Sequence, residues 1–290
     1  MAIFALFLAA FTWGSAFCVL KDTLENVSPI WLLAFRFLLA GIIMTLVCIP
    51  RMKKMSIRTL KHGIIMGIVL YFEFLFFTVG LQYTTSSKSS FIIGSYVAIL
   101  PLIYWVIRGK KPQRADILAA LVCIVGLGFI LLGSFDGVNK GDLISLLSAV
   151  CYAIHIVVTG IFAREEDGFL LNMLQIGTGG ILGLVAAMIL EPHPAAMSGM
   201  NIGSIAYLAV FCTVVPYLLS VFGQKYVKTS TSGVILSFES VFGCILSILI
   251  LGEHPGVRFV IGAMLMMCSF LIVEKISLPL PKRVAVKAEK

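Results

Sequence analysis

The sequence predicts an all-α integral membrane protein with ten transmembrane helices, arranged as two inverted five-helix repeats with both termini in the cytoplasm. Of its 290 residues, 60% are hydrophobic and 12% are charged, and the mean hydropathy is +1.05. A soluble domain carries about 25% charged residues. Ten apolar runs follow one another, each near the ~20 residues that a helix needs to cross the hydrocarbon. Charge placement and a weak internal repeat predict the orientation and the symmetry.

Apolar length defines the helices in chain order. We expect them at about 3–20, 30–49, 60–79, 89–107, 115–133, 142–160, 169–190, 202–222, 230–251 and 257–274. The first run starts at Met1 without a charged leader or a clear cleavage site, so we interpret it as a retained helix and not as a signal peptide. The second run encloses Arg36 and the third encloses Glu73. The eighth holds Pro216, which lacks a backbone N–H and predicts a kink.

The basic residues indicate the orientation. Of the 22 lysines and arginines, 17 lie in the tail and in the connections on the side of the N-terminus. The exceptions are Arg36 inside the membrane and, on the other side, Lys21, Lys88, Lys140 and Arg258. The positive-inside rule therefore places both termini in the cytoplasm. The net charge of +8 is explained by topology, and we expect no nucleic-acid partner.

Cysteine and histidine spacing argues against metal and redox chemistry. All seven cysteines fall inside apolar runs without a CxxC pair, as expected of packing residues. The four histidines show no HExxH spacing, and there is no GxxxxGK[ST] loop for ATP. We expect no cofactor, no metal site and no enzymatic activity. An intramembrane enzyme stays a remote alternative.

A shift of about 140 residues reveals a weak repeat. "GLQYTTSSKSSFI" lies over "GQKYVKTSTSGVI". The aligned pairs are Gly80 with Gly223, Tyr83 with Tyr226, Pro112 with Pro255, Trp13 with Tyr152, and Arg36 with Gln175. The pairs predict repeats at 1–135 and 140–275, followed by a basic cytoplasmic tail at 276–290. Because five crossings is an odd number, the second repeat must be inverted, an arrangement typical of secondary transporters.

Polar stripes at helical spacing predict which helices line an internal pathway. The stripes comprise Ser145, Ser148, Tyr152, His155 and Thr159 in the sixth run, Asn172, Gln175 and Thr178 in the seventh, and Ser232, Glu239, Gly243 and Ser247 in the ninth. The fifth and tenth runs have no such stripe. We expect these two helices at the periphery of the protein.

Depth along the helix selects a binding site. At about 1.5 Å per residue, Glu239 lies about 14 Å into its span, with Trp13 and Tyr152 at similar depth. A carboxylate between aromatic faces binds an ammonium group by charge and cation–π attraction. We expect substrate binding by Glu239, Trp13, Tyr152, His155, Gln175, Tyr96 and Tyr217. The alternative for Glu239 is a protonated acid that joins two helices. His155 is equally compatible with a packing role, and for Gln175 a role in joining helices is favoured over substrate binding.

Glu73 and Arg36 form a second expected group. Five aromatic residues surround Glu73 in "YFEFLFF", and an apolar surround penalises a charged carboxylate. Glu73 is therefore expected either to carry a proton in coupling or to pair with Arg36, which also needs a partner inside the membrane.

Three motifs give the chain a family resemblance. "FTWGSAF", "SPIWLLAFRFLLAG" and "LSFESVFGCILSILILGEHP" resemble signatures of the drug/metabolite transporter superfamily, in its ten-helix EamA-type branch. Pro29 and Arg36 match the second-helix signature, and Gly252 and Glu253 match the end of the ninth helix. Where the family typically has Pro after its glutamate, this chain has Ser240 after Glu239.

The resemblance implies a function and a location. It implies a secondary active transporter that exports small amphipathic metabolites, such as amino acids or amines, by alternating access across the bacterial cytoplasmic (inner) membrane. The expected partners are an amine-bearing or cationic small molecule, a proton or ion gradient, the lipid bilayer, and a second copy in a homodimer. The alternative function is uptake of organic cations such as quaternary amines.

Overall fold

The computed structural model describes residues 1–132, 138–192, 194 and 197–277, with side chains as far as Ile272. Every regular element in these ranges is helical. Nine segments are long and apolar enough to cross a membrane, and a shorter apolar stretch, Val257–Ile272, follows. The predicted all-α membrane protein of about ten helices is therefore confirmed. Of the predicted tail at 276–290, the part from residue 278 onward lies outside the described residues.

The helices follow the predicted apolar runs closely. They are α1 (Ala2–Thr23), α2 (Pro29–Cys48), α3 (Ile57–Gln82), α4 (Ser86–Gly94), α5 (Tyr96–Arg108), α6 (Arg114–Leu132), α7 (Lys140–Phe162), α8 (Gly168–Leu190), α9 (Gly199–Ala209), α10 (Val215–Tyr226), α11 (Thr229–Leu236), α12 (Phe238–Leu251) and α13 (Val257–Ser277). A 3₁₀ turn, Ile49–Lys54, follows α2, and a π-helical turn, Val210–Val214, joins α9 to α10.

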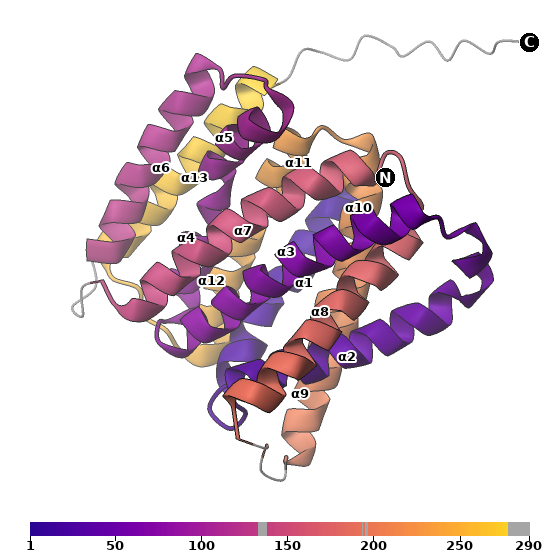
Figure 1. Ribbon diagram of the computed structural model, residues 1–290. Helices are drawn as coiled ribbons and strands as arrows, with labels where there is room; N and C mark the ends of the chain where they lie inside the picture. Colours follow the sequence, from indigo (N-terminus) through magenta and orange to yellow (C-terminus); the bar gives the residue numbers. More distant parts are fainter. Residues whose placement is uncertain (133–137, 193, 195–196, 278–290) are drawn as a thin grey trace, which may run out of the picture.

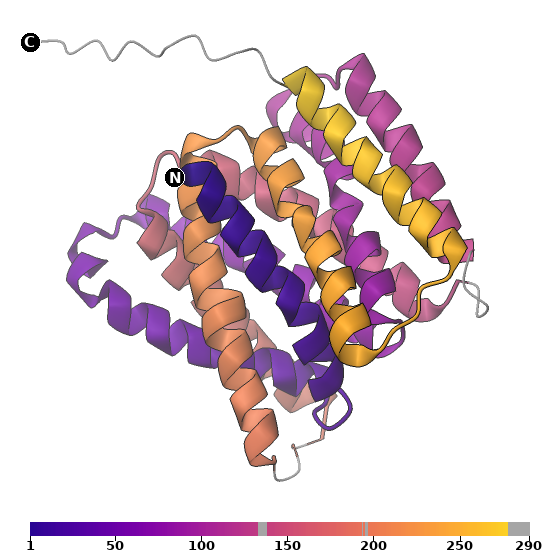
Figure 2. The same cartoon turned by 180° about the vertical axis from the view of Figure 1, so that it is seen from behind.

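The helix contacts repeat between the two halves. Helix α2 packs along α8, and α6 packs along α13, each joining matching helices of the two halves (Figures 1 and 2). Helix α3 packs on α7 as α10 packs on α1. Helices α4 and α5 contact α7 as α11 and α12 contact α1. Each of these contacts between a helix of one half and a helix of the other thus has a counterpart in which the roles of the two halves are swapped. This pattern is expected of two repeats related by a pseudo-two-fold axis.

Two of the expected helices are interrupted near their middle. The runs at 89–107 and 230–251 were expected to be continuous, but the helical pattern changes at Ser95 and at Ser237. At both positions the serine hydroxyl donates to a carbonyl three residues earlier, at 2.6 Å and 2.7 Å. Such local bonds compete with the helical ladder and bend helices. A serine with this local bond is present at the interruption of both spans.

Helices α6 and α13 form a pair at the edge of the bundle, on the left in Figure 1. Gly126 on α6 and Gly262 on α13 face each other where the two helices cross. A Cβ atom at Gly262 would lie 2.5 Å from the Gly126 carbonyl oxygen, and one at Gly126 would lie 2.8 Å from the Gly262 oxygen. Glycine is required at this crossing because neither backbone has room for a methyl group.

Gly262→Ala is expected to destabilise the protein by about 1–3 kcal/mol, because the added methyl group forces two backbones apart. The matched control is Gly128→Ala on α6, where a Cβ atom meets nothing within 4 Å. Thermal unfolding in detergent compares the two variants. Equal melting temperatures for both would contradict the close packing of α6 on α13.

A salt bridge and several hydrogen bonds join helices at the end of the bundle opposite to the N-terminus. Lys88 on α4 and Asp142 on α7 form a buried salt bridge with a 2.6 Å contact. Thr84 donates to the same carboxylate at 2.7 Å. Glu253 accepts from the backbone N–H groups of Ser86 and Ser87, at 2.7 and 2.9 Å, and so caps α4. These contacts fasten the first half to the second at this end.

Candidate functional site

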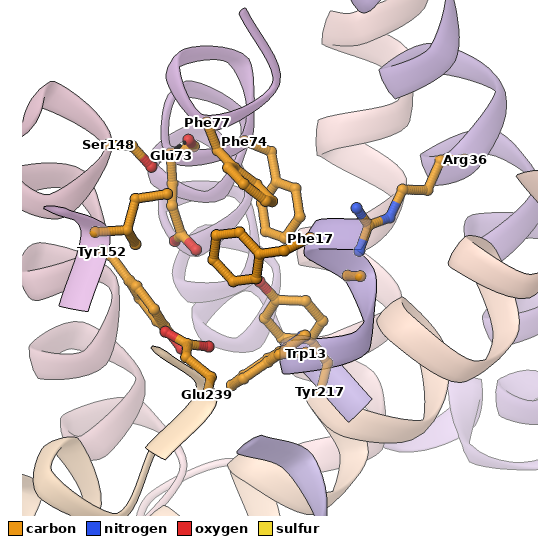
Figure 3. A pocket seen from close by; sticks show the side chains of 12 residues that line it. Trp13, Phe17, Arg36, Glu73, Phe74, Phe77, Ser148, Tyr152, Tyr217 and Glu239 are labelled. Carbon is orange, nitrogen blue, oxygen red and sulfur yellow. Dashed lines mark hydrogen bonds between the residues drawn. The ribbon is translucent and has the colours of Figure 1, made fainter. Parts of the chain in front are cut away.

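A small cavity lies at mid-depth, between helices of both halves (Figure 3). Its volume is about 30 Å³, enough for a water molecule and too small for a metabolite. The lining residues are Trp13, Ala16 and Phe17 on α1, Arg36 on α2, Glu73, Phe74 and Phe77 on α3, Ile93 on α4, Ser148 and Tyr152 on α7, Tyr217 on α10 and Glu239 on α12. A larger molecule enters only if the surrounding helices move apart.

Glu239 is the acidic group at the base of this cavity in Figure 3. It lies in the first turn of α12, where unpaired backbone N–H groups favour a carboxylate. Its Oε2 accepts a hydrogen bond from the Tyr152 hydroxyl at 3.3 Å. Its Oε1 is buried and has no hydrogen-bond partner in the described part of the chain. One acceptor of the carboxyl group is therefore available to a ligand.

Four further polar atoms of the cavity-lining residues are buried and have no hydrogen-bond partner in the described part of the chain. They are the Trp13 indole Nε1, the Tyr217 hydroxyl, Arg36 Nη1 and Glu73 Oε2. The Trp13 ring lies 5.0 Å from the Tyr217 ring and 6.1 Å from the Tyr152 ring, centroid to centroid. A buried polar group without a partner costs about 1–3 kcal/mol. Five such atoms around one cavity, with Glu239 Oε1 among them, favour a polar ligand that satisfies some of them.

Tyr96 was expected at the same site but lies behind it. Its ring rests on Tyr152 with 4.3 Å between centroids, and its hydroxyl donates to the Gly233 carbonyl at 2.9 Å. It is fully buried and is not part of the cavity lining. Tyr96 therefore supports Tyr152 from α5 and ties that helix to α11.

His155 and Gln175 belong to a hydrogen-bonded chain beside the cavity. His155 Nε2 lies 2.8 Å from Gln175 Oε1, and Gln175 Nε2 donates to Asn172 Oδ1 at 2.5 Å. Asn172 Nδ2 donates to the Tyr217 carbonyl at 3.2 Å. At the other end of the chain, His155 Nδ1 lies 3.5 Å from Glu73 Oε2. His155 and Gln175 do not line the cavity in this conformation, but His155 contacts Glu73, which does.

Arg36 is fully buried and is held by the kink of the eighth span. Its Nη2 donates to the Cys212 carbonyl at 2.7 Å, and its Nε donates to the Thr213 hydroxyl at 2.8 Å. Pro216 has no N–H to bond the carbonyl four residues earlier, which is that of Cys212. The arginine takes the place of the missing donor.

The direct pair of Arg36 with Glu73, one of the two expected arrangements, is not formed among the described residues. The Arg36 guanidinium lies over the Phe74 ring, 4.7 Å from its centroid. Figure 3 shows Arg36 and Glu73 on opposite sides of the cavity, with Phe17 and Phe74 between them. Their charges face the same space without contact.

Sequence reasoning missed several neighbours of the site. Phe17 lines the cavity beside Trp13, and its spacing of four residues from Trp13 was a usable signal because both face the same side of a helix. Cys212 and Thr213 also went unnoticed as partners of Arg36. The position of Pro216 in the sequence indicated that the Cys212 carbonyl has no helical donor. It did not indicate that Arg36 supplies the donor instead.

Comparison with known proteins gives consistent matches. The profile of the EamA-like transporter family matches residues 1–132 and, separately, 139–274. An uncharacterized transporter of Archaeoglobus fulgidus is 30% identical over 266 residues, which is 92% of this chain and 83% of the relative. The S-adenosylmethionine/S-adenosylhomocysteine transporter of Chlamydia muridarum is 27% identical over 310 residues, covering 95% of this chain and 92% of the relative.

A solved structure shares the fold. A crystal structure described only as that of a protein superposes with a TM-score of 0.71 at 16% identity, covering 95% of this chain and 96% of the other. The likeness at this identity concerns the arrangement of helices alone.

Proposed function

Because this chain belongs to the EamA-like transporter family, we propose that it is a secondary active transporter for small amphipathic metabolites that carry an amine or another cationic group. Substrate binds between the two halves, and alternating movement of the halves exposes it to each side of the membrane. The observation that carries the proposal is the buried Oε1 of Glu239, which has no partner among the described residues and faces an aromatic cavity.

The walls of the cavity support a cationic group. Glu239 supplies the negative charge, and the rings of Trp13 and Tyr217 supply faces that attract a cation by about 1–2 kcal/mol when desolvated. The unpartnered Tyr217 hydroxyl and Trp13 N–H add donors for a polar group of the same substrate, such as a carboxylate. An amino acid or a related amine meets both requirements.

The named relative is compatible with this chemistry. S-adenosylmethionine and S-adenosylhomocysteine each carry an amino group and a carboxylate, and each has an aromatic base. Both belong to the proposed substrate class. The alternative, uptake of quaternary amines, fits less well because a quaternary nitrogen has no N–H to donate to Glu239 Oε1.

Direction, energy source and assembly complete the proposal. We place the protein in the bacterial cytoplasmic membrane as a proton-coupled exporter. Export follows from the resemblance to a family that includes many exporters. The proton gradient is proposed because Glu73 and Glu239 are both buried at the cavity. A homodimer through α6 and α13 stays a prediction.

The test is substrate counterflow in proteoliposomes of the purified protein. Liposomes loaded with an unlabelled amine are expected to accumulate the labelled compound at least several-fold above protein-free liposomes. Amino acids, polyamines, S-adenosylmethionine and quaternary amines are compared as competitors, and compounds with an N–H donor are expected to compete best. The proposal fails if none of the amines drives counterflow, and the alternative gains if quaternary amines alone compete.

A further inference from the structure

The contact between Glu73 and His155 has a chemistry that substrate binding does not use. Glu73 on α3 and His155 on α7 are 5% and 3% exposed, and Glu73 Oε2 lies 3.5 Å from His155 Nδ1. No hydrogen bond from the described residues reaches that carboxyl oxygen. What holds the two groups together depends on whether a proton lies between them.

The hydrogen-bonded chain determines which ring nitrogen of His155 carries hydrogen. The Tyr217 carbonyl only accepts, so Asn172 must present its NH₂ group there and its Oδ1 to Gln175. Gln175 must then donate its NH₂ to that oxygen, which leaves Oε1 to face His155. Because Oε1 only accepts, His155 Nε2 must carry hydrogen. In a neutral ring Nδ1 is therefore the bare acceptor.

A bare Nδ1 beside a carboxylate brings two acceptors together, which is unfavourable in a buried site. One added proton removes the conflict. It lies on Nδ1, giving an imidazolium against a carboxylate, or on Oε2, giving a carboxylic acid that donates to Nδ1. In either form the pair is neutral overall and is joined by one hydrogen bond.

We infer that Glu73 and His155 together bind a single proton, at a site separate from the substrate carboxylate Glu239, and that this is the proton exchanged for substrate. The inference rests on the proposed transport function. The proton comes from water on the outer side, forms an N–H or O–H bond within the pair, and leaves to water on the cytoplasmic side. No other bond is formed or broken.

Charged and titratable groups from several helices surround the Glu73–His155 pair. Arg36 from α2 and Glu239 from α12 line the same cavity with opposite charges. The hydroxyls of Tyr152 and Tyr217 face it, and Tyr96 and Cys151 lie within electrostatic reach of Glu73.

The positive charge of Arg36 and the negative charge of Glu239 cancel. The net charge of the site is therefore zero when the Glu73–His155 pair holds its proton. The unprotonated pair leaves it negative. A cation bound to Glu239 favours the negative state and so promotes proton release, while proton uptake on the acidic side promotes cation release. This order of events drives export of the cation by an inward proton gradient.

The test measures proton movement and substrate exchange in the same proteoliposomes. An outward gradient of an amine identified by counterflow is imposed, and a trapped pH dye reports acidification or alkalinisation. Wild type is compared with Glu73→Gln and with the control Glu25→Gln, the same substitution at an exposed loop position. Glu73→Gln is expected to move at least tenfold fewer protons per molecule of labelled substrate exchanged.

Each outcome is decisive. Substrate-driven proton movement that persists in Glu73→Gln overturns the inference. Counterflow in wild type without proton movement overturns it too but leaves the transport function standing. Absence of any counterflow in wild type overturns the transport function itself.

A second measurement does not depend on whether Glu73→Gln folds. The chain has four histidines, and nitrogen-15 NMR of labelled histidine distinguishes the two neutral tautomers. The His155 signals are identified by their loss in His155→Gln. Nε2 is expected to stay protonated throughout, and any change with pH is expected at Nδ1 alone, either as protonation of this nitrogen or as a hydrogen bond that it accepts from Glu73. A neutral ring protonated at Nδ1 would overturn the inference.

Discussion

Replacement of Glu239 by Gln is expected to weaken binding of an amine substrate by at least about thirtyfold. The substitution removes the negative charge but keeps the side-chain shape and the contact with Tyr152. Loss of one partner from a buried, hydrogen-bonded charge pair costs about 2–5 kcal/mol, and each 1.4 kcal/mol corresponds to about tenfold in affinity. Calorimetric titration or ligand-induced thermal shift on detergent-purified protein measures the difference, with Glu25→Gln as the control of equal charge change.

The opposite result has a definite interpretation. If the same ligand stabilises wild type and Glu239→Gln equally, Glu239 is not its anchor. The carboxyl then serves as a protonated group joining α12 to α7 through Tyr152, at a 3.3 Å contact. The melting temperature of the variant without ligand provides a second readout. A buried carboxylate that binds a ligand lowers the stability of the protein when no ligand is bound. Glu239→Gln is therefore expected to melt no lower than wild type when no ligand is present.

Lys88→Met is expected to destabilise the protein by about 3–5 kcal/mol, because it leaves the Asp142 carboxylate buried without its ionic partner. Thr84 still donates to that carboxylate, but a neutral hydroxyl does not balance its charge. Thermal or denaturant unfolding in detergent measures the loss. Lys54→Met, at an exposed position of the 3₁₀ turn after α2, is the matched control and is expected to change stability by less than about 0.5 kcal/mol.

A double variant separates charge from packing. Lys88→Met combined with Asp142→Asn removes both charges while keeping an acceptor for Thr84. It is expected to recover a large part of the stability lost in Lys88→Met, since charges in a buried pair couple strongly. Additive losses in the double variant would contradict the role of the salt bridge in joining α4 to α7. The contact between the two halves at this end would then depend on Glu253 and its hydrogen bonds to the start of α4.

The apolar runs of the sequence were sufficient to predict the helices. Their lengths follow from the thickness of the membrane, and within the described residues the observed boundaries lie close to the expected ones. The exceptions are the changes of direction inside the fourth and ninth spans. Ser95 and Ser237 lie there within apolar runs, and a serine in a helix bends it only when its hydroxyl bonds to a nearby carbonyl. Composition does not reveal that choice.

Depth and spacing along single helices also brought three expected site residues together. Trp13, Tyr152 and Glu239 come from α1, α7 and α12, and all three line one cavity. Each lies near the middle of its own span, and each faces the protein because polar and aromatic groups at that depth avoid lipid. The period and the rise per residue are properties of a single helix. The sequence alone was therefore sufficient to predict the depth and the facing of these residues.

Partner choice was decided only by tertiary structure. One of the two expected arrangements paired Arg36 with Glu73, but Arg36 bonds to the carbonyl of Cys212 that Pro216 leaves without a donor. Glu73 approaches His155 instead, and Gln175 and Tyr96 support other side chains rather than lining the cavity. The sequence by itself determined the helices and the depth of each polar group along its helix. Which groups touch depends on how the helices of the two halves cross, because contacts between residues on different helices are set by packing and not by local period.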